Sequence, residues 1–577
     1  MDLKRFLPFL DWSRNYGKDE LKGDLSAGLT VGVMLIPQGM AYSMLAGLPP
    51  IYGLYASTIP LILYALFGTS RQLAVGPVAM VSLLIATGVG SLAATGSEEF
   101  IGLAILLALM VGVLQFSLGI FRLGFLVNFL SHPVISGFTS AAALIIGLSQ
   151  LKHLLGINIP RSNYIHEVLY NAFLEAANIH PLTVVIGLAG IATIIMVKKW
   201  KKSIPGPLVA VVLSVLVVYL LGLDKMGVKI VQDVPQGLPA FSLPSLSWDG
   251  MNALLPIAIT ISLVGFMESI AVAKAIQARH KTYEVDSNQE LIGLGLANIG
   301  GAFFSAFPTT GGFSRTAVND QAGAKTGMAS IVSALLIVLT LLFLTPLFYY
   351  LPNAILASVI MVAVFGLIDY KEAIHLWKVD KRDFVMLMTT FFATLTLGIE
   401  EGILLGVVLS LAMVLYRSTY PHMAVLGKVD GTTQYRNIKR FPQARQFNGI
   451  LVVRFDAPLF FANISYLKEK IEKMAAARED QIKLIVLGAD AINGIDSSAV
   501  TGLQELVEDY RKRGVEFYLS GVTGPIRDVF HKGGLIKHMG EDKFFMYIDE
   551  AVSHFNSKQE GTPLMRENTF AVQANVA

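Results

Sequence analysis

Long apolar stretches with short polar breaks occupy most of the chain between residues 25 and 420. A helix needs about 20 mostly apolar residues to cross the hydrocarbon core of a bilayer. The pattern therefore predicts an α-helical polytopic membrane protein. Its fourteen expected transmembrane segments are residues 25–45, 50–68, 77–94, 99–121, 125–151, 181–197, 205–222, 252–275, 289–306, 314–323, 328–350, 353–368, 383–399 and 402–418.

The pattern changes after residue 420, where short apolar runs alternate with amphipathic helical patterns. Such alternation predicts a small α/β domain with a mixed sheet, at residues 430–556. The expected strands are 450–455, 482–487 and 515–519, and the expected helices are 464–477, 497–513 and 526–532.

The two ends of the chain are polar. Residues 1–23 carry several basic side chains and predict a cytoplasmic arm. Residues 557–577 are rich in Asn, Gln and Glu, a composition that predicts a disordered tail. The membrane domain is thereby expected at residues 24–420.

Composition narrows the function classes. The chain has 577 residues, of which 54% are hydrophobic and 15% charged, whereas soluble chains carry about 25% charged residues. A wholly soluble enzyme and a disordered protein are therefore excluded. A formal net charge of +3 argues against nucleic acid as a partner. The chain has no cysteine, which excludes disulfides, thiolate metal sites and thiol nucleophiles, and we expect no metal or cofactor.

Positive charges in the short loops predict the orientation in the membrane. Lys and Arg are enriched in cytoplasmic loops. With Met1 in the cytoplasm, the three loops richest in Lys and Arg, at residues 198–202, 274–281 and 371–382, all lie on that side. An even number of spans then places both termini in the cytoplasm.

Two parts of the membrane domain resemble each other in plan. The first has a helix that is interrupted at Ile36–Gly39, and the second has a helix that contains Gly265–Glu268. Each continues to a short helix, at Pro77 and at Ser314. The paired elements lie seven spans apart, so the two repeats have opposite topology. Inverted repeats with short, Gly- or Pro-interrupted segments are typical of secondary transporters with a site at the midplane.

The two short helices predict an anion site. A half-helix that starts inside the membrane leaves its first N–H groups unpaired and carries about half a positive charge there. Two such starts that face each other form a cage for an anion. Pro77 suits a helix start, and Gly311 and Gly312 permit close approach. Arg315 adds a full charge at the second start, or is instead a charge on the cytoplasmic side that sets the topology.

Other residues of the spans have two interpretations each. Glu268 is a protonatable coupling residue near Arg315 or a protonated, hydrogen-bonded carboxyl of the helix packing. Gln38 and Tyr42 lie one turn apart, so they either face one site or pack with satisfied polar tips.

Several motifs resemble those of the SulP anion transporters, the sulfate permeases, and above all the plant sulfate transporters. The resemblance covers residues 20–556. It rests on Pro37–Tyr42, Gly68–Arg71, Val75–Ala79, Gly265–Ala271, Asp286–Leu291 and Pro308–Arg315, and on Ile492–Ser498, which resembles the STAS domain.

The resemblance implies seven-plus-seven inverted repeats with core and gate subdomains, a homodimer, and a site between the third and tenth helix starts. It implies Glu268 as the proton-coupling residue. The substrate-binding residues that it implies are Gln38, Tyr42, Val78, Ala79, Phe313, Ser314 and Arg315.

The start of a predicted helix in the STAS domain has two interpretations. Asp496–Ser498 either caps the helix, or Ser497 is a regulatory phosphorylation site as in soluble relatives of the domain. A cytoplasmic partner of the STAS domain is also expected.

The sequence thus favours a proton-coupled sulfate symporter of the cell membrane that works by elevator-like alternating access. Alternatives are a bicarbonate, chloride or dicarboxylate transporter or exchanger, and an anion sensor that signals through the STAS domain. The chain has no G-x-S-x-G, P-loop or zinc motif, so it is not expected to be an enzyme.

Overall fold

The computed structural model describes residues 7–14, 16–125, 131–159, 165–200, 205–478 and 480–559. The chain forms two compact units, Met1–Ser410 and Leu411–Ala577. Each unit has its own buried apolar core.

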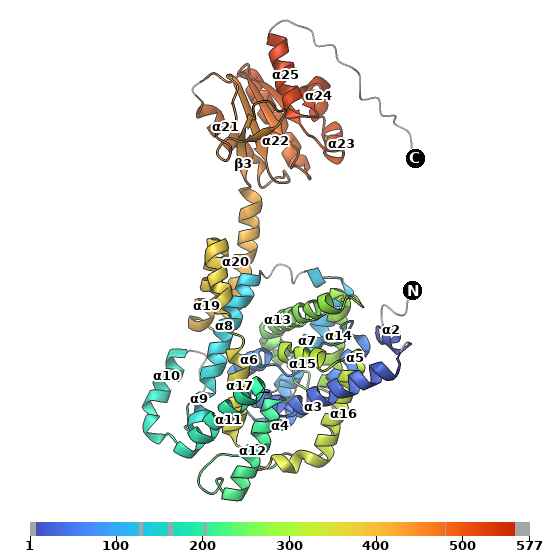
Figure 1. The fold of residues 1–577 in the computed structure, drawn as a ribbon, viewed down its shortest axis with the longest axis vertical. Coiled ribbons are helices and arrows are strands. Elements are labelled where there is room, and N and C mark those ends of the chain that lie inside the picture. Colours follow the sequence, from blue (N-terminus) through green and yellow to red (C-terminus); the bar gives the residue numbers. More distant parts are fainter. Residues whose placement is uncertain are drawn as a thin grey trace. The chain divides into compact units, whose positions relative to one another are not determined.

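The first unit is built almost wholly of helices (Figure 1). Its elements, together with the helix α20 that leads into the second unit, are α2 Phe9–Ser13, α3 Lys18–Ala46, α4 Pro50–Tyr55, α5 Ile59–Phe67, β1 Val75–Gly76, α6 Ala79–Gly88, α7 Glu98–Ile120, α8 His132–Ser149, α9 Leu151–Leu155, α10 Ile165–Leu174, α11 Pro181–Trp200, α12 Gly206–Leu221, α13 Trp248–His280, α14 Ser287–Ala302, β2 Thr310–Gly311, α15 Phe313–Gln321, α16 Met328–Leu339, α17 Asn353–Phe365, α18 Tyr370–Val379, α19 Lys381–Thr396 and α20 Ile399–Thr419.

Nine helices in the described part of the chain are long and apolar enough to cross a membrane. Shorter apolar helices include 79–91 and 206–221. Each of the fourteen apolar stretches coincides with helical residues. The structure adds α10, a short helix in the connection between the fifth and sixth stretches, where no element was predicted.

The predicted break at Ile36–Gly39 is wrong, because α3 runs without interruption through Pro37. Proline removes one helical hydrogen bond, and surrounding helices can hold such a helix together. Here α3 packs tightly on α16: a Cβ on Gly28 would lie 2.6 Å from the carbonyl oxygen of Ala329. Packing against neighbouring helices therefore accounts for a helix that continues through its proline.

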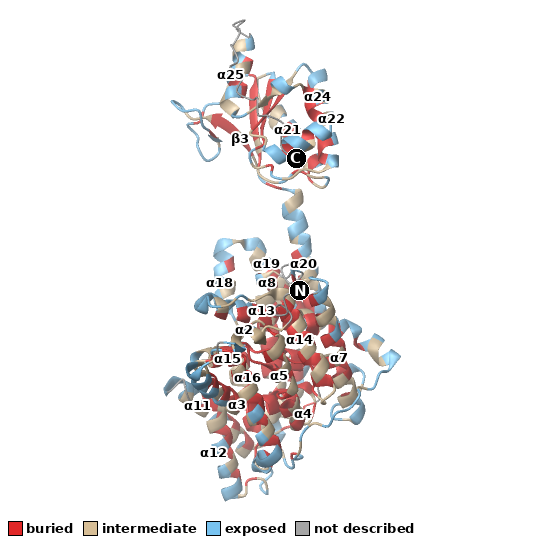
Figure 2. Cartoon of the chain, turned by 90° about the vertical axis from the view of Figure 1, so that its right-hand side faces the viewer, coloured by how far each residue is buried: buried red, intermediate tan, exposed pale blue. Residues whose placement is uncertain are grey.

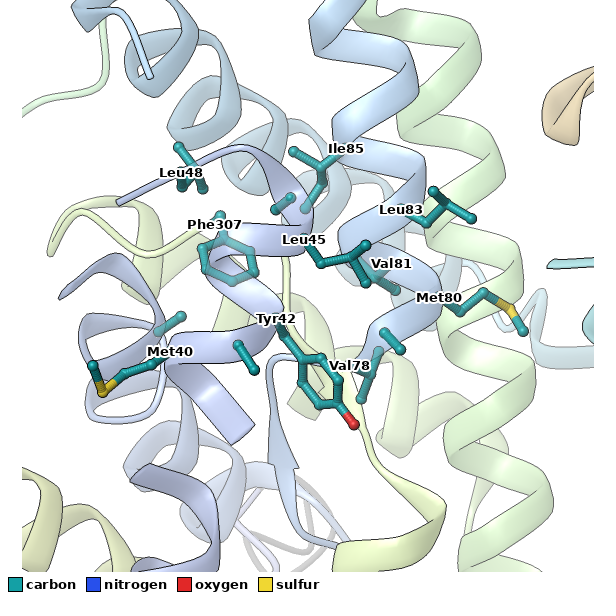
Figure 3. Packing of buried hydrophobic residues seen from close by; sticks show 14 of the residues in the cluster. Met40, Tyr42, Leu45, Leu48, Val78, Met80, Val81, Leu83, Ile85 and Phe307 are labelled. Atoms are coloured by element: carbon teal, nitrogen blue, oxygen red, sulfur yellow. The ribbon is translucent and has the colours of Figure 1, made fainter. Parts of the chain in front are cut away.

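Buried side chains concentrate on the central helices of this unit. Figure 2 shows buried positions along α3, α5 and α14, and exposed positions on α12 and α18. Apolar residues of α3 and α6 pack together in the main cluster, and Tyr42 lies beside Val78 within it (Figure 3). The start of α6 is thus held against the C-terminal part of α3.

The second unit is an α/β domain with a six-stranded mixed sheet (Figure 1). The strand order is β4-β3-β5-β6-β7-β8, with antiparallel pairing of β3 to β4 and β5 and parallel pairing elsewhere. Its elements are β3 Met423–Lys428, β4 Tyr435–Asn437, β5 Ile450–Phe455, α21 Ile464–Ala476, β6 Leu484–Gly488, α22 Ser497–Lys512, β7 Glu516–Ser520, α23 Gly524–Lys532, α24 Leu535–Met539, β8 Phe544–Phe545 and α25 Ile548–Gln559.

This domain differs from the expectation at both ends. Strand β3 lies before residue 430 and pairs with β5, so the domain begins earlier than predicted. Residues 557–559, predicted as part of the tail, belong to α25, whose Phe555 is buried. The rest of the predicted tail lies outside the described residues.

Candidate functional site

Two short strands from distant parts of the sequence pair in the interior of the helical unit. Strands β1 and β2 are antiparallel, with Val75 opposite Gly311 and Gly76 opposite Thr310. All four residues are buried. Each strand leads directly into a short helix, β1 into α6 and β2 into α15. The pairing therefore holds the starts of the two half-helices together.

The first amides of both half-helices lie outside the helical ladder. The first helical bonds run from Ser82 N to Val78 O in α6 and from Thr316 N to Gly312 O in α15, both at 3.0 Å. No side chain of the described residues caps either start. Uncapped N–H groups and the helix dipole favour an anion at both positions.

Arg315 brings a full positive charge to this place. Its side chain is buried, and its Nη1 donates to the carbonyl oxygen of Pro77 at 2.6 Å, so it bridges the two half-helices. Its Nε and Nη2 are buried and contact no acceptor among the described residues. Buried polar groups are almost always hydrogen-bonded. The unpaired donors therefore point to an acceptor that the protein itself does not supply.

Glycines make room for the guanidinium. A Cβ on Gly312 would lie 2.7 Å from Arg315 Nη2, and one on Gly76 would lie 3.4 Å from the same atom. Gly76 also has φ +150°, which disfavours other residues. The predicted roles of the glycines in close approach thus extend to Gly76, which sequence reasoning missed.

Glu268 lies partly buried on α13, next to the residue that ties this helix to β2. Its Oε2 is buried and has no hydrogen-bond partner among the described residues. The neighbouring Ser269 Oγ lies 2.7 Å from Thr310 Oγ1 and accepts from Gly311 N at 2.8 Å. The charge of Arg315 interacts with that of Glu268 and with the hydroxyl of Tyr42. The structure thus brings Arg315, Glu268 and Tyr42 into one electrostatic group.

The remaining predicted residues surround the half-helix starts in different ways. Gln38 is buried one turn before Tyr42 on α3, and its Oε1 contacts no described donor. Val78 and Ala79 are buried at the start of α6. Phe313 and Ser314 are exposed on the first turn of α15. One face of α15 is therefore accessible, while its opposite face carries the buried Arg315.

Two further residues, Ser497 and Glu290, lie away from the half-helix starts. Ser497 is exposed at the start of α22 in the second unit, where the side chain of Asp496 caps the helix by accepting from Ala499 N at 2.8 Å. This contact confirms the capping interpretation. Sequence reasoning missed Glu290, a fully buried carboxylate of α14. A single acidic residue in an otherwise apolar segment was the signal that could have found it.

Comparisons with known proteins identify the family of the chain. Residues 21–390 match the sulfate permease family, and residues 441–551 match the STAS domain. The chain is 45% identical over 563 residues to sulfate transporter 4.1, chloroplastic, of Arabidopsis thaliana, covering 94% of this chain and 82% of that protein. It is 38% identical over 582 residues to high affinity sulfate transporter 2 of Stylosanthes hamata, covering 97% and 87%.

Solved structures have the same fold. The murine Solute Carrier 26 family member A9 anion transporter, in its inward-facing state, is 26% identical with a TM-score of 0.88, over 96% of this chain and 94% of that one. The transmembrane domain of the cyanobacterial bicarbonate transporter BicA is 24% identical with a TM-score of 0.60, over 68% and 98%.

These matches confirm the predicted order of a helical polytopic membrane domain followed by an α/β STAS domain. They also confirm that the protein is a transporter and not an enzyme. The chain belongs to the sulfate permease family and carries a C-terminal STAS domain.

Proposed function

We propose that this protein transports sulfate and binds it between the starts of α6 and α15. The observation that carries the proposal is the buried Arg315, whose Nε and Nη2 have no acceptor among the described residues, beside two uncapped helix starts. A sulfate dianion can accept from several donors at once, which suits two converging sets of amides and a guanidinium fork. The relatives named as sulfate transporters support the same substrate.

We propose that protons drive the transport and that Glu268 is the coupling residue. Glu268 shares an electrostatic environment with Arg315. Binding of a dianion adds negative charge beside the carboxyl and favours its protonated form. Proton and sulfate then each raise the affinity for the other, as linkage requires. Import by symport with protons follows from this coupling.

The proposal includes the architecture that alternating access needs. Fourteen spans in seven-plus-seven inverted repeats would place β1–α6 and β2–α15 as equivalent elements. Their antiparallel pairing supports this equivalence. A core that carries both half-helices would move as an elevator against a gate, in a homodimer with both termini in the cytoplasm. We propose the cell membrane as the location, although one relative is named chloroplastic.

The STAS domain would regulate transport rather than bind the anion. Residues that form the half-helix starts all belong to the first unit. Ser497 is exposed and is the residue that we propose as a phosphorylation site. A cytoplasmic partner of this domain is a separate part of the proposal.

Uptake of labelled sulfate into liposomes that contain the purified protein tests the proposal. We expect uptake that an inward proton gradient accelerates and that unlabelled sulfate suppresses more strongly than bicarbonate, chloride or dicarboxylates do. Stronger competition by one of those anions would assign the site to that anion. Binding of sulfate without any flux would favour the anion sensor.

A further inference from the structure

One helix, α14, contacts the chain segments that lead into both half-helices. Near its start, Glu290 accepts four hydrogen bonds: from Tyr64 Oη at 2.7 Å, Thr69 N and Oγ1 at 2.6 Å each, and Ser70 N at 3.0 Å. Its side chain is fully buried. Residues 69 and 70 belong to the turn between α5 and β1, so Glu290 fixes the approach to α6.

Two turns later, Asn298 makes the matching contacts on the other side. Its Oδ1 accepts from Thr309 N at 2.7 Å and from Thr309 Oγ1 at 3.2 Å, and its Nδ2 donates to Thr309 O at 3.0 Å. The same Nδ2 lies 3.1 Å from Gln115 Oε1 of α7. Residue 309 precedes β2 directly, so Asn298 fixes the approach to α15.

The face of α14 between these two residues also touches the first approach. A Cβ on Gly293 would lie 2.9 Å from Gly68 N, so the helix and the turn before β1 meet backbone to backbone. Residues 290, 293 and 298 share one side of a helix with 3.6 residues per turn. The segments that lead into α6 and α15 therefore both contact one face of α14.

The opposite face of α14 is fixed against α7. A Cβ on Gly295 would lie 2.6 Å from Phe116 N, and one on Gly112 would lie 2.6 Å from Ile299 N. Such close backbone contact leaves α14 no room to slide or turn without a clash. The helix α14 is therefore a rigid support for the segments that contact its other face.

We propose that Glu290 and Asn298 are positioning residues that set the spacing of the two half-helix starts, and that α14 is the rigid helix that carries both of them. The inference rests on the proposed function, in which the anion binds between those starts. Hydrogen bonds weaken steeply with distance and angle. A shift of either start would therefore lower the affinity for sulfate, although neither residue touches the anion.

The variants Glu290→Gln and Asn298→Asp test this role. Each keeps the shape of the side chain but replaces an acceptor by a donor, or a donor by an acceptor, against a fixed partner. Matched controls are Glu284→Gln and Asn252→Asp, at exposed positions with no hydrogen bond to either approach. If Glu290→Gln fails to fold, Thr69→Val removes one donor to Glu290, and Thr69→Ser should restore it.

The measurement uses the absence of cysteine from the chain. Cysteines introduced at two exposed positions, Ser91 shortly after the end of α6 and Gln321 at the last residue of α15, carry spin labels in the full-length protein. Pulsed dipolar spectroscopy without sulfate gives the distribution of distances between the labels. Sulfate binding to the same proteins gives the affinity.

We expect both test variants to shift or broaden the distance distribution and to weaken sulfate binding about tenfold or more. The controls should match the wild type in both readouts. An unchanged distribution in folded test variants would overturn the proposal, and so would a shifted distribution with wild-type affinity. If the wild type binds no sulfate, the proposed function fails, and the distances alone still decide whether Glu290 and Asn298 position the half-helices.

Discussion

The start of α22 in the STAS domain contrasts with the starts of α6 and α15 in the membrane unit. In the STAS domain, Asp496 accepts from Ala499 N at the start of α22 and from Phe461 N at 2.9 Å. In the membrane unit, no described side chain caps α6 or α15. At a capped start, a side chain of the protein accepts from a first N–H group of the helix. At an uncapped, buried start, the first N–H groups remain available to a ligand.

Charged side chains repeat the contrast. Glu516 of β7 accepts from Lys543 at 2.8 Å, Lys558 at 2.7 Å and Tyr518 Oη at 2.6 Å. Arg315 and Glu268, by contrast, keep buried polar atoms that contact no partner in the described part of the chain. Glu516 is thus used within the fold of the STAS domain, whereas Arg315 and Glu268 keep polar atoms to which we assign the anion and the proton as a proposal.

The largest effect is expected from Arg315→Ala, which removes the charge that the comparison depends on. Loss of a charged partner in a desolvated site costs about 2–5 kcal/mol of binding free energy, or roughly a 30-fold to 5000-fold weaker Kd. Isothermal titration of the full-length protein with sulfate measures it. Arg315→Lys keeps the charge but not the planar fork, so its Kd for sulfate should lie between those of the wild type and Arg315→Ala.

Glu268→Gln should separate binding from coupling. The amide keeps the shape of the protonated acid and carries no charge, so we expect sulfate binding and sulfate–sulfate exchange to persist. Acceleration by an inward proton gradient should disappear. Liposome uptake at two external pH values measures the response, with the exposed Glu284→Gln as the control. A full response in Glu268→Gln would show that another residue couples the proton.

Gly312→Ala should weaken binding without harming the fold. The added Cβ would lie 2.7 Å from Arg315 Nη2, the mobile end of a side chain, and φ of Gly312 is −95°, which alanine adopts freely. The guanidinium must therefore move. We expect sulfate affinity to fall about tenfold. Gly90→Ala, whose Cβ would meet nothing within 4 Å, is the matched control and should bind normally.

Asp496→Ala tests the capped side of the comparison. Loss of a cap costs about 1 kcal/mol of helix stability. Hydrogen exchange of the α22 amides in the full-length protein should become faster, while sulfate affinity stays the same. A loss of sulfate binding in this variant would mean that the STAS domain takes part in the site.

The smallest effect concerns Glu516 and pH. Burial raises the pKa of Glu516, but hydrogen bonds from Lys543, Lys558 and Tyr518 outweigh it and hold the pKa at about 2. A depressed pKa adds stability above the unfolded value of about 4.3, and this stability is lost as the pH falls towards 2. Glu516→Gln should therefore speed hydrogen exchange in β7 at pH 7, and the difference from wild type should shrink below pH 4.3.

Sequence patterns identified the elements that local chemistry determines. Apolar length marked the helices, and β5 begins and ends at the predicted residues. Pro77 and Gly311–Gly312 marked the half-helix starts because those residue types suit a helix start and close approach. The pattern was misleading at Pro37, where packing against neighbouring helices keeps α3 continuous.

Contacts between distant segments could not be predicted from the sequence. The pairing of β1 with β2 joins two-residue strands, which are too short to give an alternating pattern. Glu290 holds a turn that lies 220 residues away, and no local signal reveals that partner. Strand β3 was missed because its partner β5 lies beyond a long connection.

The most direct test of the central claim is the position of a bound anion. A cryo-electron microscopy map of the full-length protein with selenate, a heavier analogue of sulfate, would locate it. The account predicts density between the first turns of α6 and α15, within hydrogen-bond distance of Arg315. Density elsewhere, for example in the separate cavity of about 400 Å³ that Lys152, His153 and Lys229 line, with none at the half-helix starts, would contradict it.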